Sequence, residues 1–276
     1  MSVGSTTDQP TAAGTDTEPG VEAGALTPDA ARRLLRLWDT QQSAYVAHRE
    51  NRFAVMLETL RLHLGDRVTV LDLACGPGAI SDRVLTALPE ARSVAVDHDP
   101  ILLRIAAAAL AGHGDRATVR DIDLVADGWP ARAGVTTVDA VLSSTALHWL
   151  SPAQLLAVYT TAAGLLRPGG ILLNADHLRF GADLPTLREI SQRHDEQTRQ
   201  AGFTAGALRY DEWYAEAARI PDLAALEPER ERRFADRPPQ PLAPLELHLA
   251  ALRSAGFTEV GTVWQYLDDY VVFARR

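Results

Sequence analysis

Short apolar runs alternate with longer segments of helical hydrophobic spacing between residues 67 and 177. Short apolar runs bounded by turn residues are typical of buried strands, and apolar positions three and four residues apart are typical of amphipathic helices. Strands are predicted at 68–73, 93–96, 117–120, 138–143 and 171–175. Helices are predicted over 79–88, from residue 101, and over 151–166. Strands separated by helices of this length predict βαβ units and a parallel sheet.

Two further patterns flank this region. Upstream, Thr27 and Pro28 form a helix start, because threonine caps the first turn and proline fits within it, and a second helix is predicted over 49–64. Downstream, a helix over 245–255 leads to strands at 259–263 and 269–273. These last strands are separated by too few residues for a crossover helix and are predicted to be antiparallel.

Two segments break the alternation. Residues 1–24 hold almost no large apolar side chain, which predicts a disordered tail. Residues 178–242 are polar and helical, and they end in a proline-rich turn. The predicted organisation is a tail over 1–24, a helical lid over 25–66, an α/β domain formed by 67–177 and 243–276, and a helical cap over 178–242.

Composition and net charge narrow the classes of function that the chain can have. Hydrophobic residues make up 46% of the 276 residues and charged residues 23%, which is ordinary for a protein with a core. The formal net charge of −9 disfavours nucleic acid as a partner. Cys75 is the single cysteine, so no internal disulfide forms, and neither a secretory leader nor an apolar run of bilayer length is visible. We expect a cytoplasmic protein with no membrane partner; a homodimer is compatible with the sequence.

A glycine-containing turn joins the first strand of the α/β region to its helix. Residues 71–78 read LDLACGPG, and small residues there bring a ligand against the backbone and the helix N-terminus. Asp97 ends the second strand about 20 residues later, where a carboxylate accepts hydrogen bonds from the ribose of an adenosine cofactor. The loop is not G-x-G-x-x-G: Ala74 replaces the first glycine, and Pro77 removes an N–H that a pyrophosphate uses. The motif therefore favours an adenosine cofactor without phosphate.

On these residues, and on the LRPGG turn at 166–170, the sequence resembles the class I S-adenosylmethionine-dependent methyltransferases. The resemblance implies an α/β fold with a Rossmann-like sheet of seven mostly parallel strands, an antiparallel last strand, helices on both faces and a helical cap insertion. It also implies S-adenosylmethionine as the cofactor and S-adenosylhomocysteine as its product. The residues that it assigns to the cofactor are Asp72, Ala74, Cys75, Gly76, Gly78, Asp97, His98, Asp121, Ile122 and Ser143.

The implied roles within this set differ. Asp72 lies near the methionyl amino group, Asp97 holds the ribose, and His98 lies against the adenine. Asp121 meets the adenine amino group, and Ile122 packs on the ring. Each acid has a structural alternative, because an aspartate also caps a helix or begins a turn.

The fourth strand leads into residues 143–150, which read SSTALHWL. The Asn-Pro-Pro-Tyr type signature of nucleic acid adenine and protein glutamine N-methyltransferases is absent, and the LHWL run resembles small-molecule members such as those acting on trans-aconitate. His148 is the first candidate for a general base, because the pKa of histidine lies near neutral pH. Asp176 and His177, after the fifth strand, are the second candidates. Either histidine can instead pack or hydrogen-bond, and no catalytic metal is predicted.

Candidate substrate contacts come from three segments. Tyr45 and Arg49 lie on the predicted lid, where a guanidinium can pair with a carboxylate of the cofactor or substrate, or stay on the surface. Trp149 follows the fourth strand. Trp213 and Tyr214 in the insertion are predicted to wall an apolar pocket, with a place in the core as the alternative.

The predicted function is methyl transfer from S-adenosylmethionine to oxygen, nitrogen or carbon of a small molecule. The alanine- and arginine-rich composition is typical of high-GC bacterial proteins, many of which belong to natural-product pathways. Three alternatives stay open. These are an enzyme of the same fold that catalyses decarboxylation, hydroxylation or rearrangement, a non-catalytic binding or regulatory protein, and an NAD-dependent oxidoreductase, which the loop disfavours.

Overall fold

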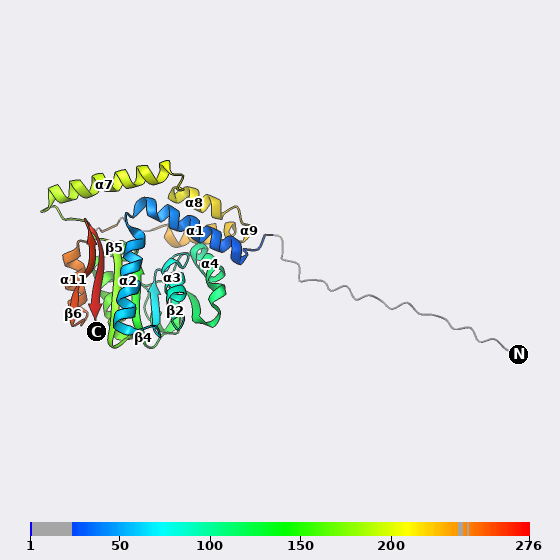
Figure 1. The fold of residues 1–276 in the computed structure, drawn as a ribbon, viewed down its shortest axis with the longest axis horizontal. Helices are drawn as coiled ribbons and strands as arrows, with labels where there is room; N and C mark the ends of the chain where they lie inside the picture. The colour runs from blue at the N-terminus through cyan, green and yellow to red at the C-terminus, as the bar shows by residue number, and fades with distance from the viewer. Residues whose placement is uncertain (2–23, 237–239, 242) are drawn as a thin grey trace.

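A seven-stranded sheet organises the chain in a computed structural model, which describes residues 1, 24–236, 240–241 and 243–276 (Figure 1). The strand order is β3-β2-β1-β4-β5-β7-β6. Strand β7 pairs antiparallel with β5 and β6, whereas β1 to β5 pair in parallel, which confirms the predicted sheet. The strands are β1 (Thr69–Leu73), β2 (Arg92–Asp97), β3 (Ala117–Asp121), β4 (Val138–Ser144), β5 (Leu166–His177), β6 (Glu259–Tyr266) and β7 (Asp269–Arg275).

Helices cover both faces of the sheet, and further helices lie across one end of it (Figure 1). The helices before β5 are α1 (Pro28–Tyr45), α2 (Arg49–Leu64), α3 (Ala79–Ala87), α4 (Pro100–Ala109), α5 (Trp129–Ala133) and α6 (Pro152–Leu165). Those after β5 are α7 (Pro185–Thr204), α8 (Tyr210–Ala217), α9 (Pro221–Ala224), α10 (Glu227–Phe234) and α11 (Leu245–Ser254). None of the helices in the described part of the chain is both long and apolar enough to cross a membrane.

Alternation of side chains along the strands supplies apolar residues to both faces. In β1, Val70 packs with residues of α2 and α3, and Leu71 packs with residues of α6 and α11. Both side chains are fully buried. Parallel strands covered on both faces read as continuous apolar runs, which is why the runs in the sequence predict the sheet.

The helix starts follow from their capping residues. The side chain of Thr27 accepts a hydrogen bond from the Ala30 N–H, and Pro28 occupies the first turn of α1. Ser151 and Gln154 form a capping box at the start of α6. A capping side chain satisfies N–H groups that have no partner within the helix. The predicted starts of both helices are confirmed.

The strand bounds differ from the prediction at the turn over 166–170. Strand β5 begins at Leu166, and the register with β4 shifts between Val138 and Ala140. The predicted turn is therefore an irregularity within the strand. A Cβ atom at Gly170 would lie 2.8 Å from the carbonyl oxygen of Asp139, so only glycine fits this close approach.

The predicted cap and lid segments meet at the end of the sheet to which the parallel strands point (Figure 1). Helix α7 crosses α1 at Gly202, where an added Cβ atom would lie 2.5 Å from the Cβ of Ala44. Helices α8 and α9 pack with α1 and α4 around an apolar cluster that includes Leu34 and Trp213. Residues 2–23 of the predicted tail lie outside the described residues.

Trp213 is a core residue, and its removal should destabilise the packing of α1 on α8. Its side chain is fully buried, its ring contacts Trp38 edge-on at 4.9 Å, and its Nε1–H donates to the Leu34 carbonyl at 3.1 Å. We expect Trp213→Ala to lower the free energy of unfolding by about 3–5 kcal/mol, measured by urea denaturation. Trp213→Phe, which keeps an aromatic ring, should lower the free energy of unfolding by a smaller amount. Equal, small effects of both substitutions would contradict this role.

Candidate active site

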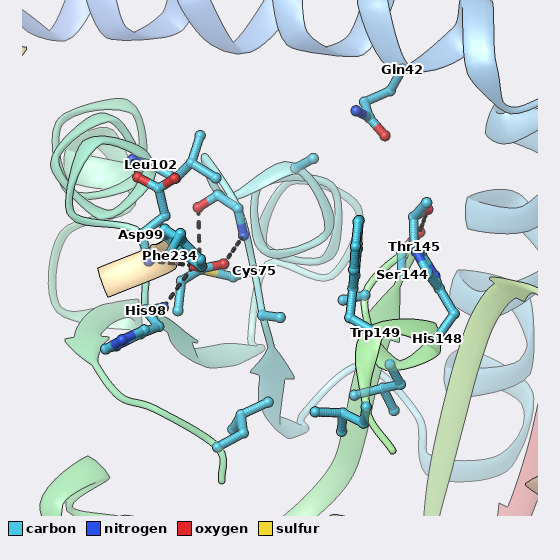
Figure 2. Close-up of a pocket in the computed structure, with 18 of the residues that line it drawn as sticks. Gln42, Cys75, His98, Asp99, Leu102, Ser144, Thr145, His148, Trp149 and Phe234 are labelled. Atoms are coloured by element: carbon cyan, nitrogen blue, oxygen red, sulfur yellow. Dashed lines mark hydrogen bonds between the residues drawn. The ribbon is translucent and has the colours of Figure 1, made fainter. Parts of the chain in front are cut away.

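A cavity of about 760 Å³ lies at the carboxyl ends of β1, β2 and β4. In open α/β sheets, ligands bind in the crevice at these strand ends. Figure 2 shows His98 and Asp99 on one side of the cavity, His148 and Trp149 on the opposite side, and Gln42 of α1 across its opening. The two sides correspond to the predicted cofactor and acceptor residues.

The turn after β1 is built from residues with positive φ. Ala74, Gly76 and Gly78 have φ values of 53°, 57° and 93°. A residue with a Cβ atom in this region costs about 1 kcal/mol, so Ala74 occupies a position that favours glycine. Ala74, Cys75 and Gly76 line the cavity. Gly78 does not reach it and instead begins α3, where an added Cβ atom would lie 3.1 Å from Leu110.

Asp97 holds this turn against the end of β2. Its Oδ2 accepts a hydrogen bond from the Gly76 N–H at 2.8 Å, and its Oδ1 accepts from the N–H groups of His98 and Asp99 at 2.7 and 2.8 Å. Burial raises the pKa of Asp97, although the backbone donors oppose this shift. Asp97 forms no ion pair with any residue in the described ranges. The result is an oriented carboxylate at the cavity wall with no cation of the described residues paired to it.

Asp72 is a second buried carboxylate on this side. It lines the cavity, and its Oδ2 accepts a hydrogen bond from the Ser81 hydroxyl at 2.7 Å. Its Oδ1 is buried and has no hydrogen-bond partner among the described residues. Burial raises the pKa of Asp72 to about 7. An unpartnered buried carboxylate oxygen fits a cationic group of a ligand.

His148 and Asp176 form a hydrogen-bonded pair at the ends of β4 and β5. His148 Nδ1 lies 2.6 Å from Asp176 Oδ1, and the His148 N–H donates to Asp176 Oδ2 at 3.1 Å. Burial favours the neutral acid, but His148 together with His177 and His248 outweighs it and lowers the pKa of Asp176 to about 2. Because an ionised carboxylate only accepts hydrogen bonds, Nδ1 carries a proton, and in the neutral imidazole Nε2 keeps its lone pair. His148 lines the cavity, whereas Asp176 is fully buried behind it.

His177 belongs to a second histidine–carboxylate pair. It lines the cavity, and its Nδ1 contacts the carboxylate of Asp269, which lies directly opposite on β7. Asp269 also pairs with Arg52, whose side chain is fully buried. The cation neutralises Asp269, so this pair differs in charge from His148–Asp176. Groups of three or more His, Cys, Asp or Glu residues placed to hold a metal ion are not found in the described part of the chain.

Three of the five predicted substrate residues line the cavity: Tyr45, Arg49 and Trp149. Tyr45 packs edge-on against Phe203 of α7 at 5.6 Å. Arg49 pairs with Asp39 at 2.6 Å, so its guanidinium is already engaged.

The other two predicted substrate residues do not line the cavity, which corrects that prediction. Trp213 faces the core between α1 and α8, because its large ring fills the space between them. The Tyr214 hydroxyl donates to Asp99 Oδ2 at 2.9 Å, which turns its ring away from the cavity. Both residues support the cavity wall from behind.

Besides Gly78, two further predicted cofactor residues lie outside the cavity lining. Ser143 is buried and donates to the Leu73 carbonyl at 3.0 Å, because its side chain points between β1 and β4. Its neighbours Ser144 and Thr145 line the cavity instead. Asp121 forms a two-pronged ion pair with Arg233 at 2.8 and 2.7 Å. His98 and Ile122, predicted beside it, do line the cavity.

Several cavity residues have no signal in the sequence. Trp38, Gln41 and Gln42 reach the cavity from α1, and other lining residues come from α10: Arg230, Arg232, Arg233 and Phe234. The α10 segment reads EPERERRF and has no apolar stripe that would predict a buried contact. Asp99 was detectable as a cap, because it precedes Pro100 at the start of α4.

Comparisons with known proteins agree with this fold. A family model described as a methyltransferase domain matches residues 70–170. The chain is 32% identical over 135 residues to trans-aconitate 2-methyltransferase of Azoarcus sp., covering 49% of each chain. It is 34% identical over 104 residues to malonyl-acyl-carrier protein O-methyltransferase of Hahella chejuensis, covering 38% of this chain and 34% of the relative. The chain therefore spans about half or less of the length of these curated relatives.

A solved structure has a similar fold over most of this chain. An O-methyltransferase family 2 protein from Planctomyces limnophilus, in complex with apigenin, matches with a TM-score of 0.55 and 20% identity, covering 92% of this chain and 63% of that chain. The seven-stranded sheet and the family model over residues 70–170 show that the α/β part of the chain is similar to methyltransferase domains of the Rossmann-like fold.

Asp72 should make the ligand-free protein less stable as pH rises. A carboxyl whose pKa is raised by folding, here to about 7, binds a proton in the folded state that the unfolded state has lost. Its contribution to the free energy of unfolding is present below about pH 4 and is lost as pH rises to about 7. Asp72→Asn should therefore gain stability over the wild type between pH 5 and pH 8, measured by thermal unfolding. A stability difference that is constant with pH would contradict this.

Proposed function

We propose that this chain is an S-adenosylmethionine-dependent methyltransferase that acts on a small-molecule acceptor. The observation that carries the proposal is one cavity with two buried, cation-free carboxylates on one side and a histidine–carboxylate pair on the other. Its volume of about 760 Å³ lies in the upper part of the usual range for ligand pockets, which suits a cofactor together with an acceptor.

The cofactor side fits a cationic nucleoside. The unpartnered Asp72 Oδ1 suits the ammonium group of the methionyl part, and Asp97 is oriented to accept from ribose hydroxyls. His98 and Ile122 line the cavity on this side, where we propose that the adenine lies. When bound, S-adenosylmethionine supplies a methyl group on a positively charged sulfur. The positively charged ligand would stabilise the ionised form of Asp72.

His148 is the proposed general base. Its Nε2 lone pair would take the proton from an acceptor hydroxyl or amine, and Asp176 holds the ring in the required tautomer. Asp176 itself is buried and acts through His148, so it is a positioning residue and not a base. His177 is the second candidate, because it lines the same cavity with its own carboxylate partner.

The helices across the end of the sheet would exclude water from this reaction. The proposed lid is 25–66 and the proposed cap 178–242; both contribute cavity residues, among them Tyr45 of α1 and Arg179. An acceptor held between them is aligned with the cofactor, which is the main requirement of methyl transfer. Natural-product biosynthesis, a cytoplasmic location and a homodimer stay predictions from the sequence.

An enzyme of the same fold with non-methylating chemistry and a non-catalytic binding protein are the alternatives. The first would bind the same cofactor, so product mass separates it from the proposal. The second keeps the fold as a scaffold, so cofactor binding separates it. The hydrogen-bonded His148–Asp176 pair at the cavity favours an acceptor that must lose a proton, because a binding protein needs no such pair.

The first measurement is calorimetric titration with S-adenosylmethionine and S-adenosylhomocysteine, with NAD as the control ligand. We expect saturable binding of the first two. Asp97→Ala should weaken it about tenfold to hundredfold, because hydrogen bonds to a charged group are lost. Asp115→Ala removes an exposed carboxylate that pairs with Arg92 and should leave the affinity unchanged. Folded wild-type protein that binds neither ligand would refute the proposal.

The second measurement follows methyl transfer by mass spectrometry to a panel of phenols, catechols, hydroxy acids and amines. With any acceptor found, His148→Gln should lower kcat by about 10²- to 10⁴-fold at unchanged affinity for S-adenosylhomocysteine. Asp176→Asn should lower kcat less and also change its pH profile, because the tautomer of His148 is no longer held. If His177→Gln causes the larger loss, the base is His177 and not His148.

A further inference from the structure

Helix α10 is attached to the rest of the molecule through charged side chains. None of the side chains of this helix is fully buried. Its sequence, EPERERRF, presents arginines toward the ends of β2 and β3, where the chain carries aspartates. A helix without a buried apolar face depends on such contacts for its position.

Arg233 makes the first attachment. Its Nη1 and Nη2 donate to the two carboxylate oxygens of Asp121 at 2.8 and 2.7 Å, and Nη1 also donates to the His98 carbonyl at 2.9 Å. Its Nε donates to Glu229 of the same helix at 2.7 Å, which orients the guanidinium before it reaches Asp121. Arg233 is 17% exposed and Asp121 50% exposed, so water reaches this pair.

Arg230 makes the second attachment. Its Nε donates to Asp99 Oδ2 at 2.6 Å, and its guanidinium lies 3.8 Å from the centre of the Tyr214 ring. The other oxygen of Asp99 caps α4. The α10 helix is thus fixed to the residues that directly follow Asp97, the proposed ribose ligand.

These attachments place α10 in the cavity wall on the cofactor side. Arg230, Arg233 and Phe234 line the cavity together with His98. The Phe234 ring meets the His98 ring at 5.9 Å and 68°, and Figure 2 shows Phe234 beside His98 and Asp99, across the cavity from Trp149. The segment predicted to cap the substrate therefore also borders the region proposed for the adenosine.

We propose that α10 is a cofactor-retaining element: Arg230 and Arg233 are positioning residues that hold Phe234 and His98 against the adenosine end, and the cofactor leaves when their ion pairs open. This inference rests on the proposed binding of S-adenosylmethionine. It also assigns Asp121 a different role from direct recognition of the adenine amino group, because Arg233 already occupies both of its carboxylate oxygens.

The two roles of Asp121 predict opposite effects of removing Arg233. If Asp121 anchors α10, Arg233→Ala releases the helix and the cofactor dissociates faster. If Asp121 instead binds adenine directly, Arg233→Ala frees its carboxylate, and dissociation stays the same or slows. Asp121→Ala speeds dissociation in both cases, so Arg233→Ala is the variant that decides.

The test measures the dissociation rate of S-adenosylhomocysteine from the full chain by surface plasmon resonance. For Arg233→Ala and Asp121→Ala we expect a rate about fivefold higher than wild type, and for the double variant no further increase, because both substitutions break one pair. The wild-type rate should rise with salt and that of the double variant should change less. Arg193→Ala, which breaks an exposed pair within α7, should match the wild type.

The outcomes distinguish a failure of the proposed function from a failure of the proposed role of α10. Wild-type protein that does not bind S-adenosylhomocysteine refutes the proposed function. Wild-type binding with an unchanged or slower rate in Arg233→Ala, or additive effects in the double variant, overturns the role of α10 alone. Thermal unfolding is recorded for each variant to check that it is folded. Arg233→Lys keeps the charge but loses the two-pronged geometry. The dissociation rate of Arg233→Lys should therefore lie between the rates of the wild type and Arg233→Ala.

Discussion

Two buried carboxylates without an ion-pair partner among the described residues, Asp72 and Asp97, are the constraint on which the site depends. Burying a charge is costly unless donors or a cation compensate it. Asp97 is compensated by three backbone N–H groups, which is why the turn after β1 must curl back to the end of β2. Asp72 is compensated less well, by donors of Ser81 on one of its two oxygens, and burial therefore raises its pKa. The fold thus keeps an unpartnered carboxyl oxygen of Asp72 at the place where a cationic ligand is proposed to bind.

The end of β5 distributes a second set of polar groups over both faces of the sheet. Successive residues of a strand point to opposite faces, so Asp176 and His177 separate. Asp176 meets His148 after β4, and His177 meets Asp269 of β7 and, through it, Arg52 of α2. The antiparallel β7 is required for the second pair, because it brings its first residue opposite the last residue of β5. The ends of β4 and β5 therefore present two imidazoles to one cavity, each held by a different carboxylate.

The insertion after β5 combines two kinds of contact. Helix α8 is held by apolar burial, with Trp213 packed between α1 and α4. Helix α10 is held by ion pairs at the sheet edge. Apolar burial is not screened by salt, whereas solvent-accessible ion pairs are weak and screened. The same segment can therefore be firmly anchored at one end and open easily at the other.

The sequence by itself determined the strands, the helix starts and the acids at the strand ends. Apolar runs, the caps at Thr27 and Ser151, and the spacing from the turn to Asp97 are local patterns, and local patterns survive in a single sequence. Tertiary structure alone decided that Trp213 belongs to the core, that Asp176 orients His148, and that Asp121 pairs with Arg233. Each of these depends on register and packing between segments far apart in the chain. An arginine-rich helix such as α10 carries no hydrophobic period, so its position becomes visible only once the aspartates it contacts are in place.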